Sequence, residues 1–188
     1  MMETERTIWT LLEEKDLPAM TEMSREKDTF RYIRRLEVMT EEEYQQFLLL
    51  KLEQIRLKTG YHWAVWLKGG GFDRGEGLVV GRGAGIDADR GDFVGAVNLN
   101  PIGNSQRLQI GCQLKRAYWG QGFASELTKR VLEFALDEAG LTEVYGVFAK
   151  DNVVSRRLLG KLGFGCIEKK TEQGEEIEVH RYPPVGLP

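Results

Sequence analysis

The stretch QLKRAYWGQGFASELTKRVLEFAL, residues 113–136, decides the fold of this chain. It runs from the end of an apolar, strand-like segment through Gly120 and Gly122 directly into a segment whose apolar residues recur at helical spacing. Glycines between a strand and a helix let backbone amides approach a ligand closely, and the first amides of a helix attract anions. The stretch therefore predicts an anion-binding turn at the N-terminus of a helix.

The composition is that of an ordinary folded domain. Of the 188 residues, 41% are hydrophobic and 29% are charged, which favours a single globular domain over residues 1–188. A net charge of -3 argues against a surface for duplex nucleic acid. The acidic opening residues lack the apolar run of a signal peptide, and no stretch is long and apolar enough to cross a membrane. We therefore expect a cytoplasmic protein with neither a nucleic-acid nor a membrane partner.

Cysteines and histidines are few in this chain. Cys112 and Cys166 are the two cysteines, His62 and His180 are the two histidines, and no CxxC spacing occurs. The sequence therefore predicts neither a disulfide framework nor a metal site. Cys112 stands in an apolar strand segment, where a neutral cysteine usually belongs to the core rather than acting as a nucleophile.

The remaining pattern alternates strands and helices, which is typical of a mixed α/β (α+β) domain. On the helix that follows the glycines, Glu126 and Arg130 have the spacing of an outer ion pair. Residues 69–91 hold nine glycines and predict a flexible excursion between two strands. Strands are predicted over 6–12, 61–67, 92–101, 106–114 and 143–149, with a closing hairpin around Gly174, and helices over 16–24, 40–60, 122–139 and 154–163.

Three phosphate-binding schemes compete for the glycine turn. A P-loop requires lysine followed by serine or threonine after the glycines, and this pair does not stand there. A dinucleotide fingerprint requires further strand–helix–strand units, but only 37 residues follow Asp151. The third scheme, a helix N-terminus that caps a pyrophosphate with a second strand and short helix as the other wall, uses all elements from 106 to 165. A tight turn without a ligand stays open as the alternative.

Two motifs carry a resemblance to a known family. LQIGCQLKRAYWGQGFASEL, residues 108–127, resembles motif A of the GNAT acetyltransferases, and DNVVSRRLLGKLGFG, residues 151–165, resembles their motif B. The residues of both motifs are similar to those of the ribosomal-protein-alanine N-acetyltransferase subfamily. The resemblance implies the GNAT fold: a mixed central sheet of about six or seven strands flanked by helices. It also implies a cofactor cleft between the fourth and fifth strands, 106–114 and 143–149.

The resemblance further implies a binding site for acetyl-CoA. Backbone groups of Gln113 and Leu114 would pair with the pantetheine arm as an added strand does. Asn152 would bind the amide or thiol end of that arm, the alternative being a turn residue at the end of a strand. The backbone amides that would hold the pyrophosphate are those of Trp119, Gly120, Gln121, Gly122, Phe123 and Ala124.

The catalytic residue that the resemblance implies is Ser155. Many family members have a tyrosine just before KLGF that protonates the departing thiolate, but Leu159 occupies that place. In the similar subfamily a serine three residues after the asparagine is proposed for this role, and Ser155 matches it. The alternative is that Ser155 caps its helix. Glu168 is a candidate general base, although a solvated strand carboxylate explains it as well.

The implied function is transfer of an acetyl group from acetyl-CoA to a primary amine. The acceptor is either the α-amine of a protein N-terminus or a small molecule such as a polyamine, an aminoglycoside or an amino acid. A non-catalytic module that senses acyl-CoA is the alternative from another functional class. We expect the protein to act as a monomer or a homodimer.

Overall fold

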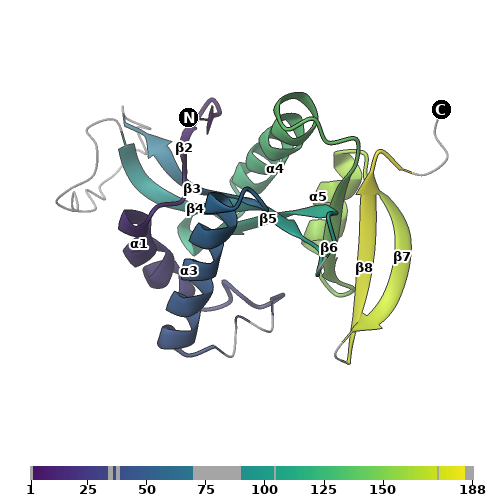
Figure 1. Cartoon of the computed structure of the whole chain (residues 1–188), viewed down its shortest axis with the longest axis horizontal. Helices are drawn as coiled ribbons and strands as arrows, with labels where there is room; N and C mark the ends of the chain where they lie inside the picture. Colours follow the sequence, from purple (N-terminus) through teal and green to yellow (C-terminus); the bar gives the residue numbers. More distant parts are fainter. Residues whose placement is uncertain are drawn as a thin grey trace.

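The computed structural model describes residues 2–33, 36, 39–69, 90–103, 105–172 and 174–184. These residues form one eight-stranded sheet in the order β1-β2-β3-β4-β5-β6-β8-β7, with helices on both faces (Figure 1). The mixed α/β fold class is confirmed. The strand count exceeds the predicted six or seven because β1, Met2–Glu3, pairs with β2 through two residues, which is too short for a periodic pattern to reveal.

The strands lie close to their predicted positions. β5 and β6 are parallel, whereas every other neighbouring pair is antiparallel in the part of the chain that the structure describes. The remaining strands are β2 (Thr7–Leu11), β3 (Tyr61–Lys68), β4 (Arg90–Pro101), β5 (Leu108–Leu114), β6 (Val144–Ala149), β7 (Gly165–Glu172) and β8 (Glu175–Tyr182).

Helices α1 (Leu17–Ser24) and α3 (Glu41–Arg56) precede β3 and cover one face of the sheet (Figure 1). Thr40 and Glu43 start α3 as a capping box: the Glu43 N–H donates to the Thr40 hydroxyl at 3.2 Å, and the Thr40 N–H donates to the Glu43 carboxylate at 2.8 Å. This box follows directly from the sequence pattern and is confirmed. It fixes where α3 begins.

Helices α4 (Phe123–Glu133) and α5 (Val153–Lys161) lie on the opposite face. The single helix predicted over 122–139 is interrupted, because a π-helical turn, Phe134–Glu138, follows α4. The Phe134 ring packs edge-on against Tyr61 and Trp63, with both centroid separations at 5.0 Å. The wider turn accompanies this aromatic contact, which a helical periodicity alone does not predict.

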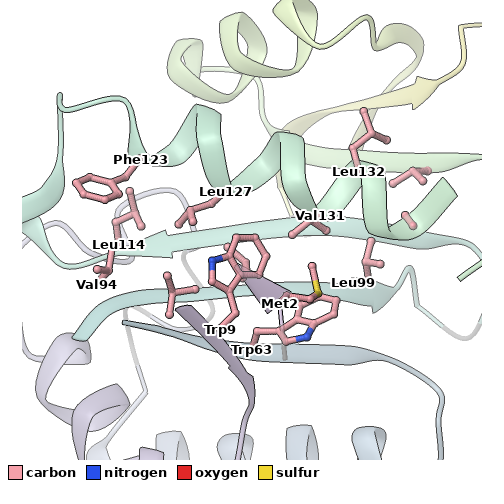
Figure 2. Close-up of a cluster of buried hydrophobic side chains, with 14 of the residues drawn as sticks. Met2, Trp9, Trp63, Val94, Leu99, Leu114, Phe123, Leu127, Val131 and Leu132 are labelled. Carbon is pink, nitrogen blue, oxygen red and sulfur yellow. The ribbon is translucent and has the colours of Figure 1, made fainter. Parts of the chain in front are cut away.

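The alternation of β3 divides the core between the two faces. Trp63 and Val65 belong to the cluster beneath α4, whereas Ala64 and Trp66 belong to the cluster beneath α1 and α3. Figure 2 shows Trp9 and Trp63 beneath Leu127 and Val131 of α4. The first strand region and the helix that follows the glycine turn therefore share one hydrophobic core.

The predicted excursion over 69–91 joins β3 to β4, and its residues 70–89 lie outside the described residues. No helix in the described part of the chain is long and apolar enough to cross a membrane.

Candidate cofactor and acceptor site

The predicted cleft lies between β5 and β6, which pair as parallel strands through Gln109 and Tyr145. β5 continues to Leu114 and β6 to Ala149 without further register pairs in this ladder. Because the strands are parallel, their carboxyl ends lie at the same end of the sheet. Backbone groups beyond the first pair are thus left for another partner.

The ladder between β5 and β4 decides which β5 residues offer these groups. Leu114 stands opposite Gly95, and the next residue, Lys115, donates its N–H to the Val94 carbonyl at 2.9 Å. Hydrogen-bonded and non-hydrogen-bonded pairs alternate along an antiparallel ladder. The backbone of Gln113 therefore faces β4, and the backbone groups of Cys112 and Leu114 face the β6 side.

Leu114 consequently fits the predicted contact with an extended ligand, and Gln113 does not offer its backbone there. The indole of Trp119 donates from Nε1 to the Leu114 carbonyl at 2.9 Å, so the Leu114 N–H is the group left for a ligand. This bond also ties the end of β5 to the glycine turn. Alternate residues of β5 direct their backbone groups to β4 and to the β6 side. Which residues do so follows from the strand register, and the sequence alone does not determine that register.

The glycine turn has the conformation that the motif requires. Gly120 and Gly122 have φ values of 72° and 82°, in the left-handed region that favours glycine. A Cβ at Gly120 would meet nothing within 4 Å, and one at Gly122 would approach only Nη2 of Arg6, at 3.7 Å. The backbone is therefore open to a ligand on this side.

The N-terminus of α4 follows this turn without a side-chain cap. The amides of Phe123 and Ala124, in the first turn of α4, have no intrahelical acceptor, as in any α-helix. A helix N-terminus of this kind attracts anions through its exposed N–H groups and its dipole. The residues of the turn thus fit the pyrophosphate of acetyl-CoA, and this fit supports the predicted set.

Contacts made by the side chains of the turn and its flanking residues stabilise its conformation. Nε2 of Gln121 donates to the Ala117 carbonyl at 2.6 Å, and Tyr118 packs edge-on against Phe123 at 5.4 Å. The turn is therefore ordered by its own sequence as well as by the strand before it.

Arg6 also contacts the turn, although sequence reasoning did not identify it. Its Nη1 donates to the Gln121 carbonyl at 3.0 Å, and its Nε donates to the Glu126 carboxylate at 2.6 Å. Glu126 therefore pairs with Arg6 and not with Arg130, whose partner is Glu138 at 2.7 Å. The expected surface pair was wrong because helical spacing does not reveal a partner 120 residues away.

Asn152 and Ser155 lie at the carboxyl end of β6. The Oδ1 atom of Asn152, a buried residue, accepts the Ser155 N–H at 3.0 Å and caps α5. Asn152 is therefore the cap of this helix, and the alternative role of Ser155 as its cap was wrong. The Ser155 side chain is half-buried in the first turn of α5. Because β5 and β6 are parallel, both residues lie at the side of the sheet where β5 meets the glycine turn.

An ion pair between a buried glutamate and a partly exposed arginine holds the loop that carries Asn152. Glu178 on β8 is 4% exposed and accepts from Nε and Nη2 of Arg156 at 2.9 and 3.1 Å. Arg156 also donates to the Lys150 carbonyl in that loop. Hydrogen bonds from Arg156, opposed by burial and assisted by His180, lower the pKa of Glu178 to about 2.

Two other candidates from the sequence are poorly placed for chemistry. Burial raises the pKa of the Cys112 thiol to about 12, which agrees with a core cysteine and not a nucleophile. Glu168 is exposed on β7, and β8 and β6 separate that strand from β5. Its position favours a solvated carboxylate over a general base.

One group of possible metal ligands occurs in the described chain. Ligand atoms of Cys166, Glu178 and His180 lie within 4.8 Å of one another. The Glu178 carboxylate, however, is bound by Arg156, and Nζ of Lys169 lies 3.6 Å from it. Two cations beside this carboxylate oppose a metal ion at the same place. The group is better explained as an ion-pair network.

Two hollows beside α1 and α3 are candidates for the acceptor side. A groove of about 500 Å³ lies between these helices, and its charged lining is Glu14, Glu22, Arg25 and Glu41. A second hollow of about 410 Å³ adjoins Tyr44, whose buried hydroxyl has no partner among the described residues.

Ion pairs tie residues 22–28 to the end of β5. Nζ of Lys115 lies 2.8 Å from Glu22, and Nη1 of Arg116 lies 3.0 Å from Asp28. The Arg116 N–H also donates to Glu26 at 2.6 Å. Residues 22–28 therefore adjoin the end of β5, where the predicted cleft lies.

Comparisons with known proteins agree with this architecture. A family model described as Acetyltransferase (GNAT) domain matches residues 6–165. An FsC-acetyl coenzyme A-N(2)-transacetylase of Aspergillus fumigatus is 30% identical over 98 residues, 48% of this chain and 42% of the fungal protein. An uncharacterized N-acetyltransferase of Bacillus subtilis, YoaA, is 31% identical over 77 residues, 40% of this chain and 44% of that protein. The aligned stretches span less than half of these relatives.

Solved structures resemble the whole described fold. A spermidine N-acetyltransferase from Vibrio cholerae, in complex with CoA and spermine, has a TM-score of 0.70 at 16% identity and covers 95% of both chains. A ribosomal-protein alpha-N-acetyltransferase in complex with coenzyme A has a TM-score of 0.69 at 12% identity, covering 95% of this chain and 94% of that one. At these identities the likeness shows the fold alone. With the family match over residues 6–165, it establishes that this chain belongs to the GNAT acetyltransferase family.

Proposed function

We propose that this protein is an N-acetyltransferase that transfers an acetyl group from acetyl-CoA to a primary amine. The observation that carries the proposal is the unpaired β5 edge at Leu114 beside the open N-terminus of α4. Trp119 joins the two through its bond to the Leu114 carbonyl. An extended ligand with a pyrophosphate at one end matches both features at once.

The β5 edge supports one direction for the pantetheine arm. With the pyrophosphate at the amides of residues 119–124, the arm runs back along β5, first past Leu114. The next backbone groups that face the cleft are those of Cys112, about 7 Å farther along the strand. Leu114 therefore holds the arm, and the Cys112 N–H is placed to stabilise the negative charge that develops on the acetyl carbonyl oxygen.

Acetyl-CoA supplies an activated thioester, which a neutral amine attacks at the carbonyl carbon as the carbon–sulfur bond breaks. We assign the Ser155 hydroxyl to give a proton to the departing sulfur, while the attacking nitrogen releases one proton to water, which in turn restores the Ser155 hydroxyl. The Oδ1 of Asn152 is used by the helix cap, so its Nδ2 group is left to donate to the pantetheine arm. The Arg156–Glu178 pair keeps the loop of Asn152 in place.

The acceptor class that we favour is a positively charged amine that loses its proton before attack. The groove between α1 and α3 is lined by three carboxylates and one arginine. Glu41 pairs with Arg25, and Glu22 pairs with Lys115. Glu14 is therefore the lining carboxylate without an ion pair among the described residues, and it is the one that can attract a cation there. This property suits the α-amine of a protein N-terminus and also suits a small polyamine. A monomer or homodimer acting in the cytoplasm stays our prediction.

Thiol release from acetyl-CoA, measured with a panel of amines, tests the proposal. The panel contains peptides with free N-termini, their N-blocked forms, polyamines, aminoglycosides and amino acids. Turnover with one class and not its blocked form supports an acetyltransferase and names its acceptor. Tight acetyl-CoA binding by calorimetry without turnover on any amine would instead support an acyl-CoA sensing module. Absence of acetyl-CoA binding would overturn both.

A further inference from the structure

The side chain of Arg6 lies against the glycine turn in four ways. It pairs with Glu126 at 2.5 Å and donates to the Gln121 carbonyl at 3.0 Å. Its guanidinium carbon lies 3.8 Å from the centre of the Phe123 ring. Its Nη2 atom is the nearest atom to the space where a Gly122 side chain would stand, at 3.7 Å. A residue from the start of the chain thus borders the predicted phosphate site.

The charges around this contact have a consequence for anion binding. Glu126 lies in the first turn of α4, so its carboxylate would repel a phosphate at the same helix N-terminus. Arg6 neutralises this carboxylate, since the two side chains are only 20% and 22% exposed. Arg6 also holds the Gln121 carbonyl by a hydrogen bond, which limits the freedom of the turn between Gly120 and Gly122.

Arg6 is itself held firmly from the other side. The Arg6 carbonyl accepts the Lys68 N–H at 3.0 Å, which fixes its backbone against the end of β3. The next residue, Thr7, begins β2 and is fully buried. The sheet therefore determines where the guanidinium lies, and the guanidinium in turn restrains the turn.

We propose that Arg6 is a positioning residue for the phosphate-binding turn, acting by neutralising Glu126 and restraining Gln121. The inference rests on the proposed function, because it takes the pyrophosphate of acetyl-CoA as the ligand of this turn. Its effect concerns only the phosphate-bearing half of the donor. A donor without the pyrophosphate does not use the turn, so the contribution of Arg6 to that donor is small.

The test compares acetyl-CoA with acetyl-pantetheine, which lacks the pyrophosphate, in the Arg6→Gln variant of the full chain. We expect kcat/KM for acetyl-CoA to fall about 10-fold or more, mainly through KM, because a hydrogen bond to a charged group contributes roughly that much. The value for acetyl-pantetheine is expected to stay within about 2-fold. Arg6→Lys, which retains the charge, should recover part of the loss for acetyl-CoA.

Arg130→Gln is the matched control, because Arg130 lies on α4 as Glu126 does, is 23% exposed compared with 20% for Arg6, and pairs with Glu138. It should leave both donors unchanged. Equal losses for the two donors in Arg6→Gln, or unchanged affinity for acetyl-CoA in a folded variant, would overturn the proposal. If Arg6→Gln does not fold, the same comparison of acetyl-CoA with acetyl-pantetheine in the Arg6→Lys variant tests the proposal. Wild-type protein that uses neither donor would instead contradict the proposed function.

Discussion

Gly122 and Gly174 have the same backbone conformation but different surroundings. Both have a φ of 82°, so each position favours glycine for conformational reasons alone. A Cβ at Gly174, in the β7–β8 hairpin, would meet nothing within 4 Å, and one at Gly122 would meet only Arg6. A left-handed glycine therefore does not by itself mark a ligand site. Gly122 differs from Gly174 because it directly precedes the N-terminus of α4, which has no side-chain cap.

Gly122→Ala should weaken acetyl-CoA binding by about 1.5 kcal/mol or more, since a lost amide contact to a charged oxygen costs roughly this amount. Gly174→Ala is the control, because alanine meets the same left-handed strain there, about 1–2 kcal/mol, far from the turn. Calorimetry with acetyl-CoA and thermal unfolding on both variants separate strain from lost contacts. Equal acetyl-CoA affinity in the two folded variants would contradict the phosphate site.

Ser155→Ala should lower turnover by about 100-fold and leave acetyl-CoA affinity nearly unchanged, if its hydroxyl protonates the departing sulfur. Stability should change little, because Asn152 and not Ser155 provides the side-chain cap of α5. Steady-state kinetics and a melting curve on one sample make the comparison. A folded Ser155→Ala enzyme with full turnover would remove the residue from the mechanism and leave water as the proton source.

The connection from β6 to α5 is held by elements that close the sheet. Arg156 on α5 joins Glu178 on β8 to the Lys150 carbonyl, directly before the residues of motif B. The Lys150 N–H donates in turn to the Glu176 carbonyl at 2.8 Å. The C-terminal hairpin therefore supports the site through these contacts without lining the β5 edge.

Stability should fall on acidification because of Glu178. Its pKa is lowered from 4.5 to about 2 in the folded protein, so its contribution is present above about pH 4.5 and is lost as the pH falls towards 2. Because the Arg156 side chain is 37% exposed, solvent screening keeps this contribution below that of a fully buried ion pair. Glu178→Gln should unfold more easily than the wild type at pH 6 and differ less from it at pH 3.

Urea unfolding at both pH values measures this difference in the free energy of unfolding. Glu176→Gln is the control, because Glu176 lies on the same strand and its ion pair with Lys150 is 65% exposed on the glutamate side. A pair so exposed contributes little. A Glu178→Gln variant whose deficit did not shrink at low pH would show that the ion pair does not carry the stability.

The whole molecule is organised around the core beneath α4, where the first and middle parts of the chain meet. Trp9 on β2 is fully buried and lies 6.2 Å from Trp63, between centroids, below Leu127 (Figure 2). β2 also carries the chain from Arg6 into the sheet. Packing in this core therefore sets the position of the turn from which the predicted phosphate contacts come.

Trp9→Ala should destabilise the fold by about 3–5 kcal/mol, the usual cost of emptying a buried aromatic site. It should also weaken acetyl-CoA binding in the remaining folded protein, since β2 loses its anchor and Arg6 its fixed position. Trp9→Phe, which retains most of the volume, should show a smaller loss of both. Denaturant unfolding and calorimetry make the measurements. Wild-type affinity for acetyl-CoA in the folded Trp9→Ala variant would contradict the link between packing in this core and the position of the turn.

Local sequence by itself determined the elements and the family. The Thr40–Glu43 box, the apolar strands and the two glycines depend on neighbours a few residues apart, and the structure confirms the elements that they predict. Motifs A and B carried the resemblance to the family, and the family model that matches residues 6–165 agrees with it. Local hydrogen bonding and backbone conformation are properties of short segments, so they can be predicted without knowledge of the tertiary contacts.

Only the tertiary structure decided which groups face the site and what holds them. The register opposite Gly95 turned Leu114 and not Gln113 towards the cleft, and Arg6 reached Glu126 across 120 residues. Glu178 found Arg156 through a strand that closes the sheet. Strand register and long-range ion pairs depend on the packing of the whole chain, because side chains meet there only after the sheet and its core have formed.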